Sequence, residues 1–343
     1  MKNILGNFKT MAIASTIAMV FSATQLQAQE ETIPEQHMTP ETQLLEWREQ
    51  LQSTASVKEK KILLGKIAQT GTFLGLMLTG QYMDVPELKL HAAECVAENA
   101  LAHPEYNGTN TRHLLTKAAY ILKGAQRERV LRWLSESSME EGFVSLFNGK
   151  DLTGWKGLVE NPIARAAMTA EELAAKQVEA DERMRQDWVV EDGLLVYAGT
   201  GFDNICTEKQ YKDFELYLDW RLDPNGKEPD AGIYLRGTPQ VQIWDIARVD
   251  VGAQVGSGGL YNNQKNRSTP LCVADRKLGE WNSFHIKMVG EKVTVWLNGI
   301  LVVDQIPLEN YWDRSRPIFP CEQIELQAHG SRVYYRDIYI KTL

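Results

Sequence analysis

Three polar side chains alternate with apolar ones near the C-terminal end of the chain, in residues 324–329. Successive side chains of an extended strand point to opposite faces, so Glu325, Gln327 and His329 are expected on one face. An imidazole can accept a proton near neutral pH, and a carboxyl group or an amide beside it can hydrogen-bond a hydroxylated ligand. The segment therefore predicts a polar strand face with one candidate general base, although a lone histidine is more often a structural residue.

The same alternation runs through residues 214–245, where Pro and Gly separate three strand-like runs. Apolar residues form one face of each run, and Tyr, Asp, Arg, Gln and Trp residues form the other. That mixture is typical of a sugar-binding surface, whereas an ordinary exposed face is richer in Thr, Lys, Glu and Ser. Both interpretations stay open, and Tyr234, Arg236 and Gln242 are the candidate substrate-binding residues of this segment.

If both polar segments line one concave sheet, their side chains converge on a groove. The converging residues would be Arg236, Gln242, Glu325, Gln327 and His329, with Asp245 at the rim. Asp245 or Glu325 could then orient His329, or bind a divalent cation together with it. The sequence requires no cofactor, and it contains no Cys-x-x-Cys pair that would predict a zinc site.

Two long loops, residues 256–266 and 308–314, are rich in aromatic and amide side chains. An aromatic ring can stack on the apolar face of a pyranose while amides bond its hydroxyl groups. We therefore expect Tyr261, Asn262 and Trp312 to contact a sugar or its aglycone. In the alternative interpretation, the aromatic residues only anchor their loops to the protein.

From residue 141 to residue 343, many short runs separated by glycine turns predict mostly β structure, a two-sheet sandwich of the jelly-roll type. Asn298 and Gly299 predict a two-residue hairpin turn. Residues from about 158 to 187 interrupt this pattern with a helical segment, whose start is indicated by the capping box of Thr169 and Glu172. This insertion would be either a lid over a site or a peripheral addition.

Residues 29–140 form a different kind of sequence, in which apolar residues recur at helical spacing. Four or five helices with short connections predict a small all-α domain, either an antiparallel bundle or a pair of HEAT-like hairpins. Its histidines share no motif with a carboxylate, so no metal site is expected there. We expect a structural or docking role for this domain.

Residues 1–28 have the features of a signal peptide: two lysines, a short apolar run and an acceptable cleavage site before Gln29. The apolar run is too short to span a membrane, so we expect an exported protein, periplasmic or secreted and soluble, with no transmembrane segment. The formal net charge is -8. Because no basic surface is available to neutralise phosphates, nucleic acid is not an expected partner.

Eight short motifs appear in order across residues 143–343 and together resemble the bacterial 3-keto-disaccharide hydrolase family. They are FVSLFNGKDLTGW at 143–155, WVVEDGLLV at 188–196, YKDFELYLDWR at 211–221, GIYLRG at 232–237, QVQIWD at 240–245, GEWN at 279–282, LNG at 297–299 and LQAHGSRVYYR at 326–336. The resemblance implies a concanavalin-like jelly-roll fold and activity on glycosides oxidised at C3 of the sugar.

Two positions depart from the pattern of that family. The family would have Asn-Ser-Gly before the arginine strand, where this chain has Asp230, Ala231 and Gly232. The family's Glu-x-Gln begins here with Gln240. If that glutamate is a catalytic acid in some members, this protein must act without it.

The chemistry of a 3-keto sugar suits the candidate residues. Ordinary glycosidases need two carboxylates around the anomeric carbon, whereas a ketone acidifies the C2 proton, so that one base can start a β-elimination at C1. His329 suits the role of base, and Arg236 and Gln242 could donate hydrogen bonds to the C3 oxygen. No Gly-x-Gly-x-x-Gly follows a strand, so a separate sugar 3-dehydrogenase would have to make the substrate.

Two other functions would use the same residues. A lectin-like binding module would have the same fold and polar face without needing a base. An ordinary glycosidase or polysaccharide lyase would act on unoxidised glycan.

Overall fold

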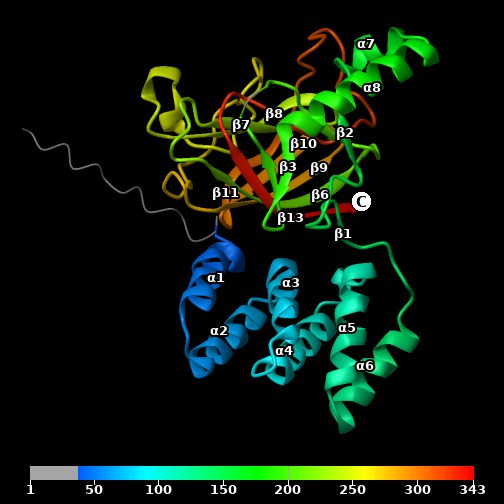
Figure 1. Ribbon diagram of the computed structural model, residues 1–343, viewed down its shortest axis with the longest axis vertical. Coiled ribbons are helices and arrows are strands. Elements are labelled where there is room, and N and C mark those ends of the chain that lie inside the picture. Colours follow the sequence, from blue (N-terminus) through cyan, green and yellow to red (C-terminus); the bar gives the residue numbers. More distant parts are fainter. Residues whose placement is uncertain (1–37, 200) are drawn as a thin grey trace, which may run out of the picture. The chain divides into compact units, whose positions relative to one another are not determined.

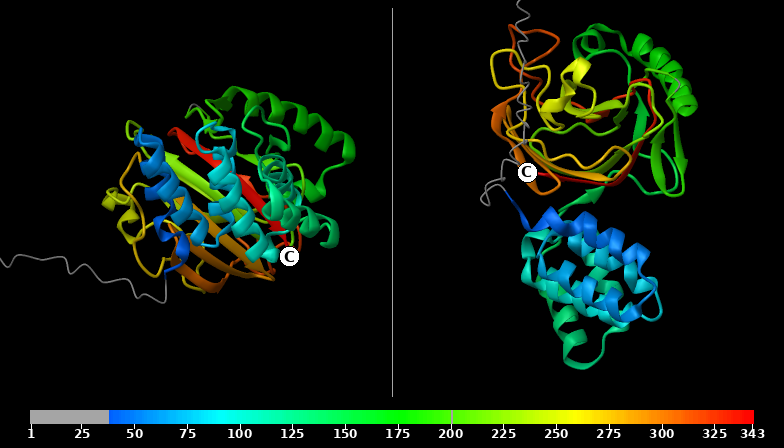
Figure 2. Two further views of the ribbon diagram at one scale, coloured as in Figure 1. Left: turned by 90° about the horizontal axis from the view of Figure 1, so that it is seen from below. Right: turned by 90° about the vertical axis from the view of Figure 1, so that its left-hand side faces the viewer.

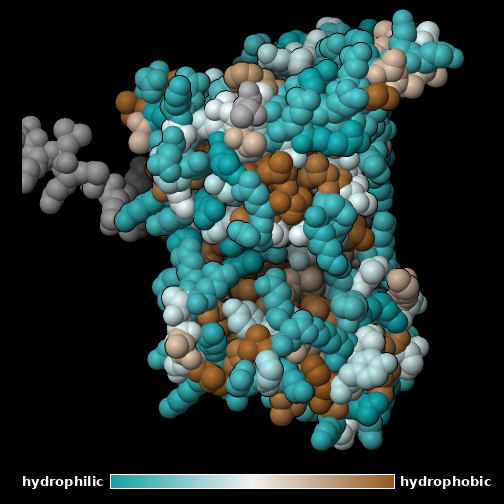
Figure 3. Space-filling view, in the orientation of Figure 1, coloured by the Kyte–Doolittle hydropathy of each residue, from teal (hydrophilic) through white to brown (hydrophobic). Residues whose placement is uncertain are grey.

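The computed structural model describes residues 38–199 and 201–343, so the predicted signal peptide lies outside the described residues. The described residues form one compact unit. The division into a helical domain and a sandwich domain therefore stays a prediction. None of the helices in the described residues is both long and apolar enough to cross a membrane. The face seen in Figure 3 is mainly hydrophilic over helices and strands, with apolar residues in smaller groups between them.

Six α-helices precede the first strand in the described part of the chain (Figure 1). They are α1 (Leu44–Ser53), α2 (Val57–Gln69), α3 (Phe73–Gln81), α4 (Lys89–Ala102), α5 (Thr109–Ile121) and α6 (Gly124–Glu136). The sequence predicted four or five. The break between α1 and α2, at residues 54–56, contains neither Gly nor Pro, so no breaker residue marked these two helices as separate.

Thirteen strands in the same described ranges form two antiparallel sheets. They are β1 (Val144–Ser145), β2 (Trp155–Gly157), β3 (Trp188–Glu191), β4 (Leu194–Tyr197), β5 (Ile205–Thr207), β6 (Phe214–Leu222), β7 (Asp230–Leu235), β8 (Thr238–Trp244), β9 (Asn282–Val289), β10 (Lys292–Leu297), β11 (Ile300–Pro307), β12 (Glu325–Leu326) and β13 (Val333–Thr342).

Sheet A has eight strands in the order β11-β10-β9-β6-β13-β4-β3, with β1 also paired to β13, and sheet B has five in the order β2-β5-β12-β7-β8. The arrangement confirms the predicted jelly-roll β-sandwich with an N-terminal helical region (Figure 2). Because side chains alternate between the two faces of each strand, apolar side chains of both sheets fill the space between the sheets. Leu216 and Leu218 of β6 face Ile233 of β7 and Val241 of β8 across the core, and all four are fully buried.

The three runs of residues 214–245 do not share one sheet, as their common alternation had suggested. The first run becomes β6 at the centre of sheet A, whereas the other two become β7 and β8 of sheet B. The polar residues of β6, among them Tyr217 and Asp219, therefore lie on the outer face of sheet A, on the far side of the sandwich from those of β7 and β8. Alternation fixes which residues share a face but does not identify the neighbouring strand.

Turns and caps lie where local sequence predicted them. Asn298 and Gly299, both with positive φ, join β10 to β11. In the insertion, α7 (Pro162–Ala167) is followed by α8 (Ala170–Asp187), and the Thr169–Glu172 capping box starts α8. The insertion packs on β2, because Gly157 has no side chain: a Cβ there would lie 2.1 Å from the Ala180 carbonyl oxygen.

The helical region packs on the outer face of sheet A through aromatic rings. Phe73 at the start of α3 lies 4.3 Å from Phe143, 5.3 Å from Tyr339 and 6.0 Å from Tyr217, measured between ring centroids. Phe143 and Tyr217 belong to the same apolar cluster as the helix core. Such contacts contribute burial of large apolar area, so helices and sheet share one core.

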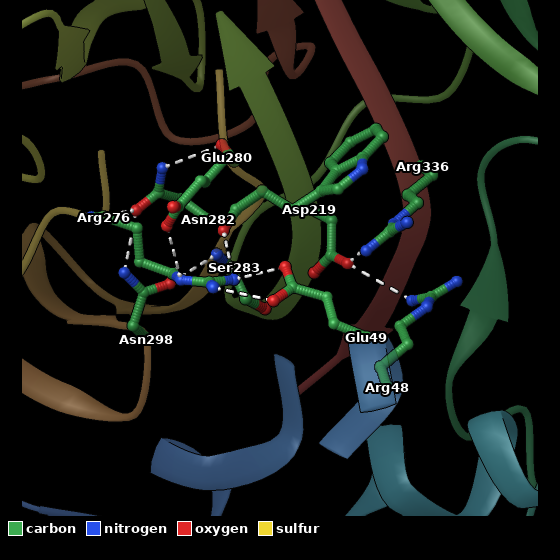
Figure 4. A network of polar contacts seen from close by, with 10 residues as sticks. Arg48, Glu49, Asp219, Arg276, Glu280, Asn282, Ser283, Asn298 and Arg336 are labelled. Atoms are coloured by element: carbon green, nitrogen blue, oxygen red, sulfur yellow. Dashed lines mark hydrogen bonds and ion pairs between the residues drawn. The ribbon is translucent and has the colours of Figure 1, made fainter. Parts of the chain in front are cut away.

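Ion pairs accompany these rings (Figure 4). Asp219 of β6 accepts from Arg336 of β13 at 3.0 Å and from Arg48 of α1 at 3.3 Å. Arg48 also pairs with Asp337. Nearby, Arg276 binds both carboxylate oxygens of Glu49, at 2.7 and 2.9 Å. A buried carboxylate needs such partners because removing it from water is costly.

Glu41 and His285 meet at the same boundary, with His285 Nδ1 4.0 Å from Glu41 Oε2. Burial raises the pKa of Glu41 to about 7 and lowers the pKa of His285 to about 4. Between these values both groups are mainly uncharged, so their contact is not an ion pair there. The His285 ring is held by stacking between Tyr217 at 4.2 Å and Trp296 at 4.6 Å.

The raised pKa of Glu41 predicts a pH-dependent stability. A group whose pKa is higher in the folded state stabilises the fold below its unfolded pKa, and this contribution is lost as pH rises through the folded value. Between pH 4.5 and 8, the ionisation of Glu41 should lower the free energy of unfolding by about 3 kcal/mol. Glu41→Gln should remove this loss in urea unfolding measured across that range, whereas Glu98→Gln, an exposed control in α4, should keep it. An unchanged pH dependence in Glu41→Gln would contradict the assignment.

Candidate functional site

Sheet B brings the two predicted polar segments together. Strand β12 pairs with β7 and β7 pairs with β8, with Glu325 opposite Tyr234 and Gly232 opposite Gln242. After β12 the chain continues alongside β7, because the Gln327 amide donates to the Gly232 carbonyl at 2.9 Å. Cross-strand partners lie on the same face. The outer face of sheet B is called the polar face below; its floor is made by Asp230, Gly232, Tyr234, Gln240, Gln242, Glu325 and Gln327.

Gly232 lets two amide side chains lie flat across the middle of the polar face. A Cβ at this position would be 2.9 Å from Gln240 Cδ and 3.0 Å from Gln327 Oε1. Any larger residue would therefore push both amides off the sheet. A cavity of about 210 Å³ adjoins this face and is lined by Gln242, Trp244 and Tyr261 among others.

A chain of hydrogen bonds crosses β8 to β7 and ends beside the histidine. The Gln240 amide nitrogen donates to Gln242 Oε1, and Gln242 Nε2 donates to Asp230 Oδ1 at 2.8 Å. The other oxygen, Asp230 Oδ2, lies 3.9 Å from His329 Nδ1. Burial raises the pKa of Asp230, and the neighbouring imidazole opposes this shift. The side chain of His329 is 37% exposed, so the ring is both oriented by the protein and open to a ligand.

Glu325 lies at the other end of the polar face and is only 1% exposed. Burial raises its pKa to about 8, opposed by the Arg165 guanidinium and by a hydrogen bond from Asn204. The carboxyl group is therefore mainly protonated at neutral pH. His329 lies four positions after Glu325, which corresponds to about 13 Å between their Cα atoms in extended chain.

Several buried polar atoms on this face have no hydrogen-bond partner among the described residues. They include Glu325 Oε2, Gln327 Oε1 and His329 Nδ1. Buried polar groups are normally satisfied, and an orphaned group needs an explanation. Three such atoms on one face indicate a site that a polar ligand or water completes.

Arg236 does not point into this site. It occupies the two-residue turn between β7 and β8 with a φ of 49°, so strand alternation does not apply to it. Its guanidinium donates to the Pro320 carbonyl at 3.1 Å and to the Gly290 carbonyl, and the residue is 3% exposed. Arg236 joins two loops to the sheet, and its predicted role as a donor to substrate is not supported by its position.

Asp245 also lies apart from the polar face. Because Trp244 belongs to that face, the next residue points to the opposite side of β8. The Asp245 carboxylate accepts from the Ala247 amide at 3.0 Å, closing a turn, and lines a small hollow with Trp220 and Asp275. Its predicted place at the groove rim beside His329 is not supported by these contacts.

The two aromatic loops border opposite ends of the polar face. Tyr261 packs edge-on against Trp244, with ring centroids 5.2 Å apart, and Trp312 Nε1 donates to the Gly237 carbonyl at 2.7 Å. The loops also touch each other, because Arg314 donates to the Asn262 carbonyl at 2.7 Å. Both rings anchor their loops, and both are partly exposed, so loop anchoring and contact with a sugar remain compatible with the structure. Contact with a sugar stays a prediction.

A comparison of the sequence with models of known protein families shows the family to which the chain belongs. The model of the 3-keto-alpha-glucoside-1,2-lyase-like domain matches residues 142–341, which is more than half of the chain. The chain belongs to the 3-keto-alpha-glucoside-1,2-lyase-like family. Its members process carbohydrates, and the match ends one residue before the end of β13. The helical region precedes the matched segment.

Solved structures similar to this chain include two from Parabacteroides distasonis, each described as a "putative glycosyl hydrolase". One is 23% identical and covers 59% of this chain and 94% of its own, with a TM-score of 0.43. The other is 22% identical and covers 59% and 100%, with a TM-score of 0.42. Carbohydrate-binding module CBM66 from Bacillus subtilis is 11% identical and covers 55% and 96%, with a TM-score of 0.33. A search of the curated proteins gives no match.

The two departures from the family pattern are neighbours in space. Gln240, where the resemblance implies a glutamate, and Asp230, where it implies an asparagine, both hydrogen-bond Gln242. Compared with the pattern that the resemblance implies, the carboxylate lies at the other end of this three-residue chain, beside His329.

Sequence reasoning missed four residues of the site: Asp230, Arg165, Asn204 and Phe202. Extending the alternation of β7 by two residues from Gly232 would have identified Asp230. Arg165 comes from the insertion and binds Glu322 at 3.0 Å, Asn204 lies in a loop, and Phe202 is 72% exposed with its ring 6.3 Å from that of His329. No sequence pattern connects these three to sheet B.

In residues 38–199 and 201–343, no group of three His, Cys, Asp or Glu side chains could hold a metal ion. The cation considered for His329 with Asp245 or Glu325 therefore has no ready-made ligand set there. Asp245 lies on the wrong side of β8 for that purpose.

The position of Arg236 predicts an effect on stability rather than on binding. Arg236→Met should remove the charged donor of two partly buried hydrogen bonds, and should lower the free energy of unfolding in urea by about 1–3 kcal/mol. Arg221→Met, in the half-buried position on β6, is the matched control and should cost less. Near wild-type stability of Arg236→Met would contradict the structural role.

Proposed function

We propose that the protein cleaves glycosides whose sugar carries a ketone at C3, by removing the C2 proton and eliminating the substituent at C1. The proposal rests on two groups that lie on the same polar face. One is the half-exposed imidazole of His329, held beside Asp230, and the other is the buried acid Glu325, whose pKa is raised to about 8. One face thus offers a base and a carboxyl group that stays uncharged, which suits β-elimination from a ketone.

In this proposal His329 is the base, and Asp230 is a positioning residue. Asp230 Oδ2 faces the Nδ1 side of the ring at 3.9 Å, which leaves Nε2 as the nitrogen that accepts the C2 proton. A carboxylate near Nδ1 favours the imidazolium that forms when the proton is taken. Gln242 fixes the Asp230 carboxylate at 2.8 Å, so this side chain cannot swing away from the ring without losing a hydrogen bond.

Glu325 keeps the floor of the polar face free of negative charge. It is 1% exposed and lies four positions before His329 along the chain, so it acts from behind the site and does not contact the reacting atoms. Gln327 lies between Glu325 and His329 on the same face and is the candidate donor to the C3 oxygen, where negative charge grows as C2 loses its proton.

The proposed reaction balances without a cofactor. The C2 proton passes to His329, and the C–H electron pair forms the C2=C3 enolate with charge on the C3 oxygen. When the enolate collapses, a C1=C2 double bond forms and the C1–O bond breaks. The leaving alkoxide takes the proton from the imidazolium. The products are an alcohol and an unsaturated 3-keto sugar, and water added across the double bond would complete a hydrolysis.

This arrangement favours β-elimination over ordinary glycoside hydrolysis. Hydrolysis of an unoxidised glycan uses two carboxylates aimed at the anomeric carbon. The oxygens of Asp230 are directed to Gln242 and His329, so this carboxylate is not free to flank a sugar. A C3-oxidising dehydrogenase would have to supply the substrate, and we propose that the protein meets it after export.

The substrate class is tested by comparing a 3-keto-glucoside with its unoxidised parent, following release of the aglycone. Turnover of the keto form alone is expected, and His329→Ala should lower its kcat by roughly a hundred- to ten-thousand-fold. His113→Ala, which replaces an exposed histidine of α5, is the matched control and should have no effect. Turnover of the parent would indicate an ordinary glycosidase, and binding of both without turnover a lectin-like module.

The protonation of Glu325 predicts the alkaline side of the pH profile. Because the ionised form would place a negative charge behind the developing enolate, kcat should fall as pH rises through about 8. In Glu325→Gln, the amide cannot ionise, so residual activity should no longer fall there. Glu208→Gln, at an exposed position of the same sandwich, should retain the wild-type fall. An alkaline fall that persists in Glu325→Gln would assign it to another group.

A further inference from the structure

A second cavity lies on the far side of the sandwich from the polar face. It measures about 350 Å³, within the range of pockets that hold small ligands. Helices α1 and α3 form one wall, and β6 and β9 of sheet A form the other. The proposed elimination chemistry uses none of its residues.

The sheet side of the cavity is a wall of hydrogen-bonding groups. Tyr217 and Asp219 of β6 stand beside Ser283 and His285 of β9, paired across the strands as neighbours. His285 Nε2 is buried without a hydrogen-bond partner in the described part of the chain, and so is Nε of Arg48, which lines the cavity from α1. Since His285 is held by rings on both sides, its free nitrogen cannot turn to find a partner.

The helix side is apolar. Leu44 comes from α1, and Leu74, Met77 and Leu78 come from α3. A cavity with one apolar wall and one hydrogen-bonding wall suits a ligand with an apolar face and several hydroxyl groups. A sugar ring has that distribution. The exposed residues Glu46 and Gln81 also line the cavity and mark the side on which a ligand would enter.

The charges of the lining argue against an anionic ligand. Both guanidinium groups are already committed: Arg48 pairs with Asp219 and Asp337, and Arg276 pairs with Glu49. Figure 4 shows the Arg48–Asp219 and Arg276–Glu49 pairs between α1 and the strands. The cavity also carries more carboxyl groups than guanidinium groups, since Glu41 and Glu46 line it as well. An added carboxylate or phosphate would therefore meet net repulsion.

We propose that this cavity is a second binding site of the protein, which takes an uncharged pyranose between the helical region and sheet A. The site is separate from the polar face, because the two lie on the outer faces of opposite sheets. Binding there would connect α1 and α3 to the sandwich through the ligand. The helical region would then be part of a sugar-binding site rather than only a support.

The test measures binding of methyl β-D-glucopyranoside, an uncharged unoxidised pyranoside, by saturation-transfer NMR with the full folded chain. Leu74→Trp fills the cavity from its apolar wall, and Gln81→Trp blocks it from an exposed position that carries little folding cost. Leu90→Trp, on the exposed face of α4, is the matched control. We expect binding to wild type and to Leu90→Trp, and at least a tenfold loss of affinity in both cavity variants.

Two results would overturn the proposal. One is the absence of binding to wild type. The other is undiminished binding by Gln81→Trp and by any folded Leu74→Trp, which would place the sugar elsewhere, such as on the polar face of sheet B. D-glucuronate tests the chemical class, because the carboxylates of the lining should exclude it. Equal binding of glucuronate and of the methyl glucoside would reject the uncharged class and overturn the proposal.

Discussion

The attachment of the helices to the sandwich depends on the buried carboxylate of Asp219, which needs a partner from the helices. It lies on the central strand of sheet A, where water is excluded and an unpaired charge would be very costly. Arg336 of the neighbouring strand provides one partner, and Arg48 of α1 provides the other. The second partner comes from outside the sandwich. Removing the helices would leave Asp219 with a single guanidinium and would expose Tyr217 and Phe143 beside it. The family domain in this chain is therefore adapted to its helical region.

The same alternation that builds the sandwich core leaves two outer faces with polar side chains. On sheet A, the helices cover these side chains, and the charges pair with one another. On sheet B, loops and the insertion cover them only in part, so that His329 stays accessible while Glu325 does not. Burial raises the pKa of a carboxyl group and lowers the pKa of an imidazole, so both become uncharged. It keeps Glu325 protonated near neutral pH, and it keeps His285 uncharged on the other sheet. Solvent access thus distinguishes the face for which we propose catalysis from the face for which we propose binding.

The local sequence predicted well which residues share a strand face, but predicted less well which strands are neighbours. The pattern around Glu325 and that around Tyr234 assigned both residues to polar strand faces, and the structure brings them opposite each other. The partner of β6 could not be predicted, since period-two alternation is identical in either sheet. The alternation predicted from the sequence does not extend to Arg236, because β7 ends one residue earlier. Arg236 itself lies in the turn and has a positive φ. Arg165 and Asn204 reach the site from an insertion and a loop, through contacts that depend on the tertiary fold.

The hydrogen-bonded chain from Gln240 to Asp230 has a direction. An ionised carboxylate can only accept, so Gln242 must present its nitrogen to Asp230 and its oxygen to Gln240. The backbone carbonyls of Ala231 and Ile243 impose the same direction, because they also accept from Gln242 Nε2, at 3.2 and 3.1 Å. These two acceptors do not change with pH, so protonation of Asp230 would leave both amides as they are. The charge beside His329 can therefore change while the order of donors and acceptors along the floor of the site stays fixed.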